Sequence, residues 1–468
     1  MTRFHIAPDI AEATTLDTAF YRDPAVYEAV REQVFARSWQ WLGDTEDAAE
    51  PGALSPRELL PGLLDEPLLL ARDREGALRC LSNVCTHRGN LLVQQRCVAD
   101  QIRCGYHSRR FDLAGRMTFM PEFAGARNFP SPGDHLPQVP FGTWGTQVFA
   151  SVDPVVPLEA VIGDMQARLG WMPLAQLRHD PSRDAEYAFD AHWALYVENY
   201  LEGLHIPFVH PALNQVLDMG LYEYELRRWC NLQLAEAREG EQAFELPPQS
   251  PDHGRRIAAY YYWVFPTLML NFYPWGLSVN VVQPQGPSRT RVVFRSYVGN
   301  AALLGGGAGG ALHQVEMEDE AVVLTVQRGI RSRLYRHGRY SPSREQRITD
   351  VDVVQAVALD QPADADRLAG GAQLDHLHAE AVLRVRRQHA VGDVEARAVK
   401  VARAAVADVP DERGLVQQLE HEGGVAGVHA AQAQPLGGRH RIVGRHHDAS
   451  RSHSRRWKWC TPCSWVGA

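Results

Sequence analysis

Two short segments of the sequence each hold one cysteine and one histidine at a spacing suited to metal binding. Cys85 and His87 form a C-x-H pair, and Cys104 and His107 form a C-x2-H pair after sixteen intervening residues. The chain has 468 residues and only seven cysteines, too few for a disulfide scaffold and odd in number. Metal binding is therefore the better use to consider for these cysteines.

Two kinds of metal centre fit this set of ligands. A Rieske [2Fe–2S] cluster takes two cysteines on one iron and two histidines on the other, and the neutral imidazoles make its reduced state easier to reach. A structural zinc ion also accepts two cysteines and two histidines. Zinc fingers usually pair like ligands, whereas each segment here mixes Cys and His. We therefore favour a Rieske cluster.

A second candidate site lies in the segment ENYLEGLHIPFVH, residues 198–210. On a straight helix, His205 and His210 would project about 140° apart. Pro207 lies between them, so the helix must bend or end there, which can bring both rings to one point. Two histidines in a helical segment are only suggestive, because such residues are often core or surface histidines.

A third ligand follows from the pattern of a helix predicted over residues 312–336. Its predicted buried stripe consists of Val315, Val322, Val326 and Ile330. Asp319 falls on this stripe, with Glu318 and Glu320 to either side. A buried carboxylate is costly unless it is paired or binds metal. Two histidines and one carboxylate form the facial triad of non-haem iron oxygenases; the alternative is an Asp paired with an Arg or capping a loop.

Glu202 lies three residues before His205, on the same face of the predicted helix. Its carboxylate can accept a hydrogen bond from the second imidazole nitrogen, as carboxylates behind metal-binding histidines do. The alternative is a solvated glutamate.

The elements expected to hold these residues are mixed helix and sheet, an α+β protein. Residues 24–42 predict a helix capped by Asp23, and Leu68–Leu81 predict a β-hairpin. Strands are expected at Ser278–Gln283 and Arg291–Val298. We expect a helical segment at 1–44, a β-rich domain at 45–155 and a larger α+β domain at 156–346.

The last 122 residues, 347–468, contain no Phe or Tyr and only three Trp. A packed core needs aromatic and branched side chains, so we expect this tail to be poorly ordered. A shifted reading frame or a misjoined segment would also explain its abrupt onset. Within it, Cys460 and Cys463 form an isolated C-x-x-C, a weak metal or redox signal.

Composition limits the partners. The formal net charge of −8 argues against nucleic acid or an anionic membrane. No apolar run approaches the ~20 residues that span a bilayer, and the N-terminus does not have the pattern of a signal peptide. We therefore expect a cytoplasmic protein.

With both motifs in this order, the sequence resembles the catalytic α subunit of Rieske-type non-haem iron oxygenases, the aromatic ring-hydroxylating oxygenases. The resemblance runs from about 30 to about 346. It implies a Rieske domain followed by a helix-grip (START-like) catalytic domain, in a head-to-tail homotrimer. The residues that match the family's metal ligands are Cys85, His87, Cys104 and His107 for the [2Fe–2S] cluster, and His205, His210 and Asp319 for a mononuclear Fe(II).

The resemblance also implies roles for two further residues. Glu202 matches a carboxylate that links His205 to the cluster ligand at position 107 in the neighbouring subunit, and Asn199 matches an asparagine close to the iron. Most relatives have Asp in place of Glu202, and Glu is similar to members that oxidise choline-like or carnitine-like compounds. Ser108 replaces a common Gly, a change we expect to be tolerated. The residues after Gln346 do not resemble a family C-terminus.

The implied activity is that of a terminal oxygenase. Electrons from NAD(P)H would arrive through a separate ferredoxin or flavin reductase, and O2 activated at the iron would hydroxylate an aromatic or similar small organic substrate. Monooxygenation of a quaternary ammonium compound is the alternative. Two others are a Rieske electron carrier, for which Asp319 would be dispensable, and an inactive enzyme with a defective C-terminus.

Two further features bear on the substrate and the reductase. Aromatic residues crowd 260–275, where some could enclose a trimethylammonium group or an aromatic ring and most would be core. Gly305–Gly310 matches G-x-G-x-x-G on paper, but without a βαβ pattern we expect a flexible loop rather than a nucleotide site.

Overall fold

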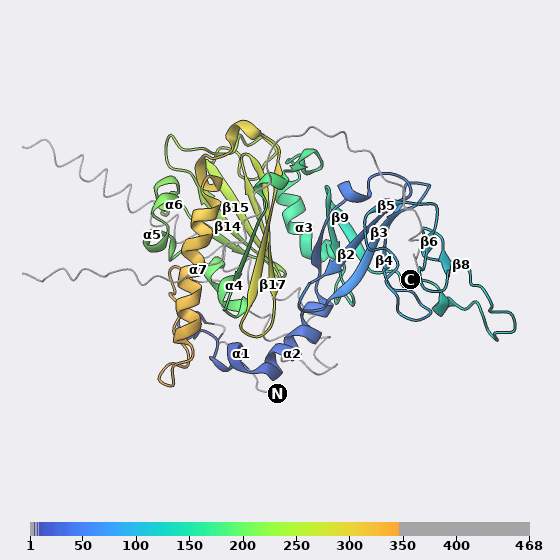
Figure 1. Ribbon diagram of the computed structural model, residues 1–468. Helices are drawn as coiled ribbons and strands as arrows, with labels where there is room; N and C mark the ends of the chain where they lie inside the picture. The colour runs from blue at the N-terminus through green and yellow to red at the C-terminus, as the bar shows by residue number, and fades with distance from the viewer. Residues whose placement is uncertain (1–3, 5–6, 8, 346–468) are drawn as a thin grey trace, which may run out of the picture. The chain divides into compact units, whose positions relative to one another are not determined.

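The computed structural model describes residue 4, residue 7 and residues 9–345. The predicted tail, with Cys460 and Cys463, lies outside these residues. The described part combines helices and antiparallel sheets (Figure 1). Its α-helices are α1 (Ala19–Arg22), α2 (Pro24–Gln33), α3 (Leu158–Leu169), α4 (Trp193–Tyr200), α5 (Ile206–Val209), α6 (Pro211–Val216) and α7 (Leu312–Gly329).

The N-terminal half is rich in short strands, which form three small sheets with the orders β1-β10-β9, β4-β3-β2-β5 and β6-β7-β8. These strands are β1 (Gln40–Asp44), β2 (Ala53–Leu59), β3 (Glu66–Arg72), β4 (Leu78–Ser82), β5 (Cys97–Val98), β6 (Ile102–Arg103), β7 (Arg110–Phe111), β8 (Met117–Phe119), β9 (Phe141–Trp144) and β10 (Gln147–Ala150). The hairpin predicted at Leu68–Leu81 is confirmed as β3 and β4, with Leu69 opposite Leu81.

The C-terminal half is built on an eight-stranded sheet with the order β11-β18-β17-β16-β15-β14-β13, in which β12 also pairs with β18. Its strands are β11 (Arg178–His179), β12 (Ala185–Phe189), β13 (Glu223–Leu226), β14 (Cys230–Glu236), β15 (Ile257–Val264), β16 (Leu268–Tyr273), β17 (Gly276–Pro284) and β18 (Thr290–Val298). The strand pair predicted around residues 278–298 is confirmed, with Ser278 opposite Ser296. Because every recorded pairing in this sheet is antiparallel, Gly305–Gly310 does not open a βαβ unit.

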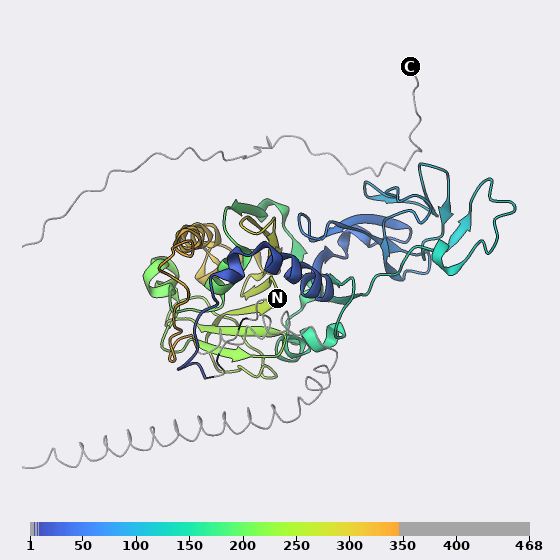
Figure 2. The same ribbon diagram turned by 90° about the horizontal axis from the view of Figure 1, so that it is seen from below.

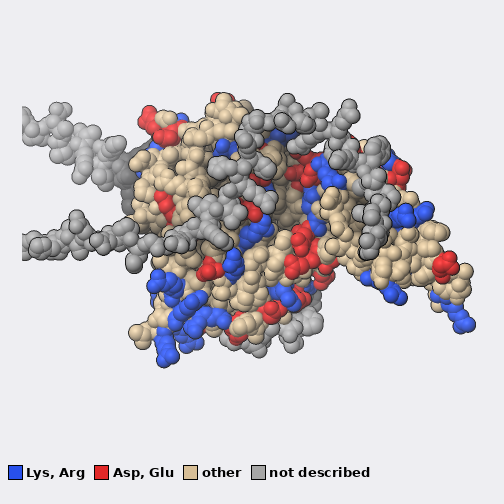
Figure 3. Space-filling view, viewed as in Figure 1, with Lys and Arg blue, Asp and Glu red and all other residues tan. Residues whose placement is uncertain are grey.

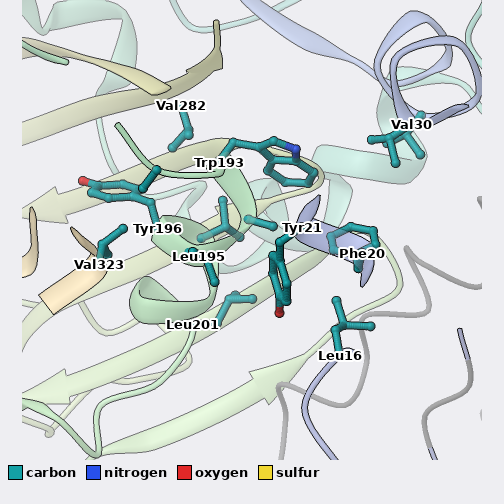
Figure 4. Packing of buried hydrophobic residues seen from close by; sticks show 14 of the residues in the cluster. Leu16, Phe20, Tyr21, Val30, Trp193, Leu195, Tyr196, Leu201, Val282 and Val323 are labelled. Carbon is teal, nitrogen blue, oxygen red and sulfur yellow. The ribbon is translucent and has the colours of Figure 1, made fainter. Parts of the chain in front are cut away.

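The helices α4 and α7 pack together beside this sheet, and the N-terminal helices α1 and α2 cover the same core (Figures 1 and 2). Figure 4 shows Tyr21 of α1 beside Leu195 of α4, and Trp193 of α4 lies in the same cluster as Phe20, Val282 of β17 and Val323 of α7. This core fixes α4 against α7, and both helices lead directly into the candidate active site.

The helix predicted over 24–42 begins as expected but is shorter. Asp23 caps α2, because its Oδ1 accepts a hydrogen bond from the Ala25 amide at 2.9 Å. The helix ends at Gln33, and residues 40–44 form β1 instead, paired with β10. Alternating burial along β1 and its pairing with a distant strand outweigh local helix preference there.

The predicted buried stripe of the helix at 312–336 is only partly confirmed, because Ile330 is buried but Val315 and Val322 are half-buried. The buried residues of the helix are Glu316, Val323 and Gln327, whereas Val326 is 41% exposed. The spacing of apolar residues predicted the adjacent face of the helix to be buried. The face that is buried carries two polar residues, which are tolerated there because each has a hydrogen-bond partner. Glu316 accepts a hydrogen bond from Tyr196, and Gln327 accepts one from the His192 amide.

The helix α7 also ends at Gly329 rather than near residue 336. Exposed arginines such as Arg331 and Arg333 follow it. Together with Arg328 in the last turn, they complement the negative end of the helix dipole. Figure 3 shows Lys and Arg gathered at the lower left, on the side where the lower end of α7 lies in Figure 1. Among the described residues, no helix is long and apolar enough to cross a membrane.

Candidate metal centres and active site

The four residues predicted to bind a cluster lie in two matching turns, one after β4 and one after β6. In each turn an amide four residues on donates to the cysteine carbonyl, from Gly89 to Cys85 (2.9 Å) and from Ser108 to Cys104 (3.1 Å). The two histidine rings that follow these cysteines have their centroids 4.8 Å apart. The structure thus brings both halves of the motif together.

The unsatisfied polar atoms at this place fit a cluster. The Nδ1 atoms of His87 and His107 are buried and have no hydrogen-bond partner. Cys85 and Cys104 are each 2% exposed and free. Buried polar atoms are normally satisfied, so two unpartnered ring nitrogens beside two thiols fit a group that all four residues would bind. The amide of Tyr106 also donates to Cys104 Sγ at 3.4 Å.

Ser108, which follows His107, has φ +60°, in the left-handed region. Glycine adopts this region without strain, which explains why glycine suits the position. Serine adopts it at the cost of about 1 kcal/mol, and its hydroxyl accepts a hydrogen bond from Arg103 at 2.9 Å.

His205 and His210 flank the four-residue helix α5. The chain leaves the helical conformation at the end of α4, at Tyr200, earlier than the predicted bend at Pro207, which instead lies in the first turn of α5. The short helix turns the two rings toward each other, and their Nε2 atoms are 3.1 Å apart.

Asp319 of α7 completes a group of three possible metal ligands. Its Oδ1 lies 3.0 Å from His210 Nε2 and 3.6 Å from His205 Nε2. The three ligand atoms all lie within 4.8 Å of one another. Asn199 donates a hydrogen bond to the same Oδ1 at 2.6 Å, which fixes the carboxylate.

Two glutamates hold the outer nitrogens of these rings. Oε1 of Glu202 lies 2.6 Å from His205 Nδ1, and Oε2 of Glu318 lies 2.7 Å from His210 Nδ1. Carboxylates in this position orient metal-binding imidazoles and raise their basicity. The contact of Glu202 was predicted, although Glu202 lies beyond the end of α4 rather than on a helix. The contact of Glu318 with His210 was not predicted, because adjacent residues of a helix project about 100° apart and Glu318 was expected to point away from the site.

The surroundings of His210 stabilise positive charge. Burial alone would lower the pKa of this imidazole, but its hydrogen bonds to Asp319 and Glu318 outweigh burial, so the pKa is raised. A position that favours a proton between these groups also favours a metal cation.

A cavity of about 90 Å³ lies beside the three ligands. Its lining includes carboxyl groups and tyrosines but no Lys or Arg among the described residues. The carboxyl groups are those of Glu202, Glu316 and Asp319. Of the aromatic residues crowded at 260–275, only Tyr261 and Tyr273 line the cavity, and most of the others belong to the core, as expected.

Two protein families match the chain. The Rieske [2Fe-2S] domain matches residues 38–130, and the ring hydroxylating alpha subunit (catalytic domain) matches residues 174–352. The chain belongs to the Rieske non-haem iron oxygenases. These matches favour a Rieske cluster over a zinc ion, and an oxygenase over a simple electron carrier. They imply a Rieske cluster and a mononuclear iron, and the two sets of residues fit these groups.

Among related oxygenases, the chloroplastic choline monooxygenase of Arabidopsis thaliana is 27% identical over 367 residues, covering 73% of this chain and 82% of that protein. The carnitine monooxygenase oxygenase subunit of Escherichia coli (strain K12) is 28% identical over 334 residues, covering 69% and 86%.

Solved structures show the same fold. The quaternary ammonium Rieske monooxygenase CntA, in complex with an inhibitor, has a TM-score of 0.60 at 23% identity, covering 75% of this chain and 96% of that one. Naphthalene 1,2-dioxygenase from Rhodococcus sp. has a TM-score of 0.57 at 19% identity, covering 75% and 95%. The fold of this oxygenase is therefore shared by enzymes that act on unlike substrates.

Proposed function

We propose that His205, His210 and Asp319 bind the catalytic iron and that Cys85, His87, Cys104 and His107 bind the cluster. The observation that carries the first assignment is the convergence of three ligand atoms within 4.8 Å beside a cavity. A ferrous ion with this ligand set supplies open coordination positions for dioxygen, and a Rieske cluster supplies electrons one at a time. Asn199 and Glu318 hold the ligands in place from behind.

Glu202 is the residue we propose to connect the two centres. Besides contacting His205 Nδ1, its carboxylate accepts hydrogen bonds from the amides of Leu204 and His205, so it is held rigidly. In a head-to-tail trimer it would meet His107 of the neighbouring subunit, as the family resemblance implies. A structure of the quaternary ammonium monooxygenase is likewise described in terms of inter-subunit electron transfer. A ferredoxin or flavin reductase would supply the electrons.

For the substrate, we propose a small organic cation with a quaternary ammonium group, oxidised by monooxygenation. The supporting observation is the lining of the cavity, which holds carboxyl groups but no Lys or Arg among the described residues, so no cationic side chain there repels a cation. The rings of tyrosines such as Tyr261 and Tyr273 add cation–π attraction, worth about 2 kcal/mol when desolvated. The relatives named for choline and carnitine oxidation point the same way.

The same charge pattern distinguishes between quaternary ammonium compounds. A zwitterion such as carnitine carries a carboxylate, which needs a cationic or strongly donating partner when buried. The described lining offers no Lys or Arg for it. We therefore propose a substrate of the choline type, a cation without a carboxylate.

A single-turnover experiment tests this function without requiring the native reductase. The protein would be reduced with dithionite, freed of excess reductant, and exposed to labelled dioxygen with choline, carnitine or indole. Product from choline carrying one labelled oxygen atom is the expected result. Dihydroxylated indole carrying two would replace the proposal with an aromatic dioxygenase, and preferred turnover of carnitine would refute the argument from cavity charge.

Asp319→Ala is the matched control for this experiment. The variant should hold about two irons and two sulfides instead of about three and two, keep the Rieske EPR signal, and form no product. Unchanged product formation by this variant would remove Asp319 from the proposed iron site.

A further inference from the structure

The guanidinium of Arg109 is buried beside the proposed cluster site. The side chain is 2% exposed, although arginine is rarely buried unless it is paired. It follows His107 by two residues, directly before β7, so its position in the chain carries it back against the two turns. A buried cation at this place requires either a structural or an electrostatic reason.

Two contacts bring Arg109 close to the residues that would bind the cluster. Its Nη1 donates a hydrogen bond to Oγ1 of Thr86, the residue between Cys85 and His87, at 2.7 Å. Its guanidinium lies 5.9 Å from the ring centroid of Phe123, and that ring packs edge-on against His87 at 5.5 Å. Arg109 therefore contacts the Cys85–His87 turn directly through Thr86 and indirectly through Phe123.

The positive charge is only partly balanced. Nη2 of Arg109 pairs with Oδ1 of Asp134 at 3.0 Å, but the Asp134 side chain is 19% exposed while that of Arg109 is 2% exposed. The other oxygen of Asp134 accepts hydrogen bonds from the amide and hydroxyl of Ser131. Solvent screens an exposed charge more than a buried one, so the field at the turn is that of the cation.

We propose that Arg109 raises the reduction potential of the Rieske cluster, with Asp134 setting how far. Reduction adds one negative charge to the cluster, and a fixed cation stabilises the reduced state. Arg109 acts through the field at the cluster and not as a ligand. The inference rests on the cluster-binding part of the proposed function and not on the substrate.

The test is a redox titration of the full-length protein, with the cluster monitored by EPR and its iron and sulfide measured for each variant. Arg109→Gln should lower the potential by at least the equivalent of a tenfold change in the redox equilibrium, about 59 mV for one electron. Arg109→Lys, which keeps the charge, should stay closer to the wild-type potential than Arg109→Gln. Asp134→Asn, which leaves the cation unpaired, should raise the potential.

The opposite signs of the two expected shifts in reduction potential distinguish an electrostatic role of Arg109 from a structural one. Arg109→Gln and Asp134→Asn break the same ion pair, so a purely structural role would shift both potentials in the same direction, which would overturn the proposal. If Arg109→Gln fails to assemble a cluster, Asp134→Asn still tests the proposal. An unchanged or lowered reduction potential in Asp134→Asn would contradict it. A wild-type protein without a Rieske signal would instead refute the cluster assignment itself.

Discussion

Oε2 of Glu318 lies 2.7 Å from Nδ1 of His210, and Glu318 directly precedes Asp319 on α7. Two adjacent residues of one helix therefore reach the same histidine from opposite sides, Asp319 at Nε2 and Glu318 at Nδ1. His210 is 1% exposed, so its ring is held between these carboxylates with little access to solvent. The geometry of the proposed iron site depends on both residues, although only one is a ligand candidate.

Replacing Glu318 with Gln should weaken iron binding by about 10- to 100-fold, the usual cost of losing a carboxylate behind a metal-binding histidine. Competition with a chelator, followed by metal analysis, measures the change. Glu320→Gln removes the same charge from the same helix and is the control. Equal iron affinity in both variants would show that the contact with His210 does not matter.

Replacing Glu202 with Gln should slow reoxidation of the reduced cluster by substrate and dioxygen about 10- to 100-fold. The amide keeps the shape but loses the charge that holds His205 Nδ1–H. Stopped-flow absorbance of the pre-reduced protein measures the rate, and the iron and sulfide contents should stay at wild-type levels. A wild-type rate would place the electron path elsewhere.

Replacing Glu316 with Gln should weaken binding of an organic cation by up to about 10-fold. The effect is smaller than that of a fully ionised partner, because burial raises the pKa of this carboxyl well above its usual value and part of the attraction is used in ionising it. Glu316 is 2% exposed and lines the cavity, its Oε2 accepts a hydrogen bond from Tyr196, and its Oε1 has no partner. Equilibrium binding of choline and of neutral indole should be compared. A similar loss for both ligands would indicate a packing defect instead of charge recognition.

Local motifs made much of this molecule predictable. Cys85 and His107 belong to a motif whose chemistry depends on residue type and short spacing, which the sequence displays directly. The contact between Glu202 and His205 was also predicted, because three residues of separation suffice for it in a turn as well as in a helix. Predictions of this kind need no knowledge of distant packing.

Tertiary packing explains what the sequence did not reveal. The buried face of α7 carries Glu316 and Gln327, whose partners come from α4 and the residue before it, more than a hundred positions away. An apolar pattern cannot anticipate a polar residue that is buried with a partner. For the same reason Glu318 was overlooked, since its contact with His210 spans 108 positions.

Glu198 gives a prediction about stability. Burial raises the pKa of its carboxyl to about 7, while a 2.5 Å hydrogen bond from Tyr21 opposes the shift. Tyr340 also faces it, and both tyrosines have raised pKa values, so they stay neutral.

Because the folded pKa of Glu198 lies above the unfolded value, the folded state holds more protons between these values, and its stability falls as pH rises through that window. Gln at position 198 cannot titrate, so Glu198→Gln removes this pH-dependent loss of stability. The variant should therefore gain stability over wild type as pH rises from about 5 to about 7, on the order of 1–3 kcal/mol, and the gain should level off above about pH 8. Thermal unfolding midpoints of both proteins across this range measure the difference. A difference that does not change with pH would mean that Glu198 is already ionised in the folded protein.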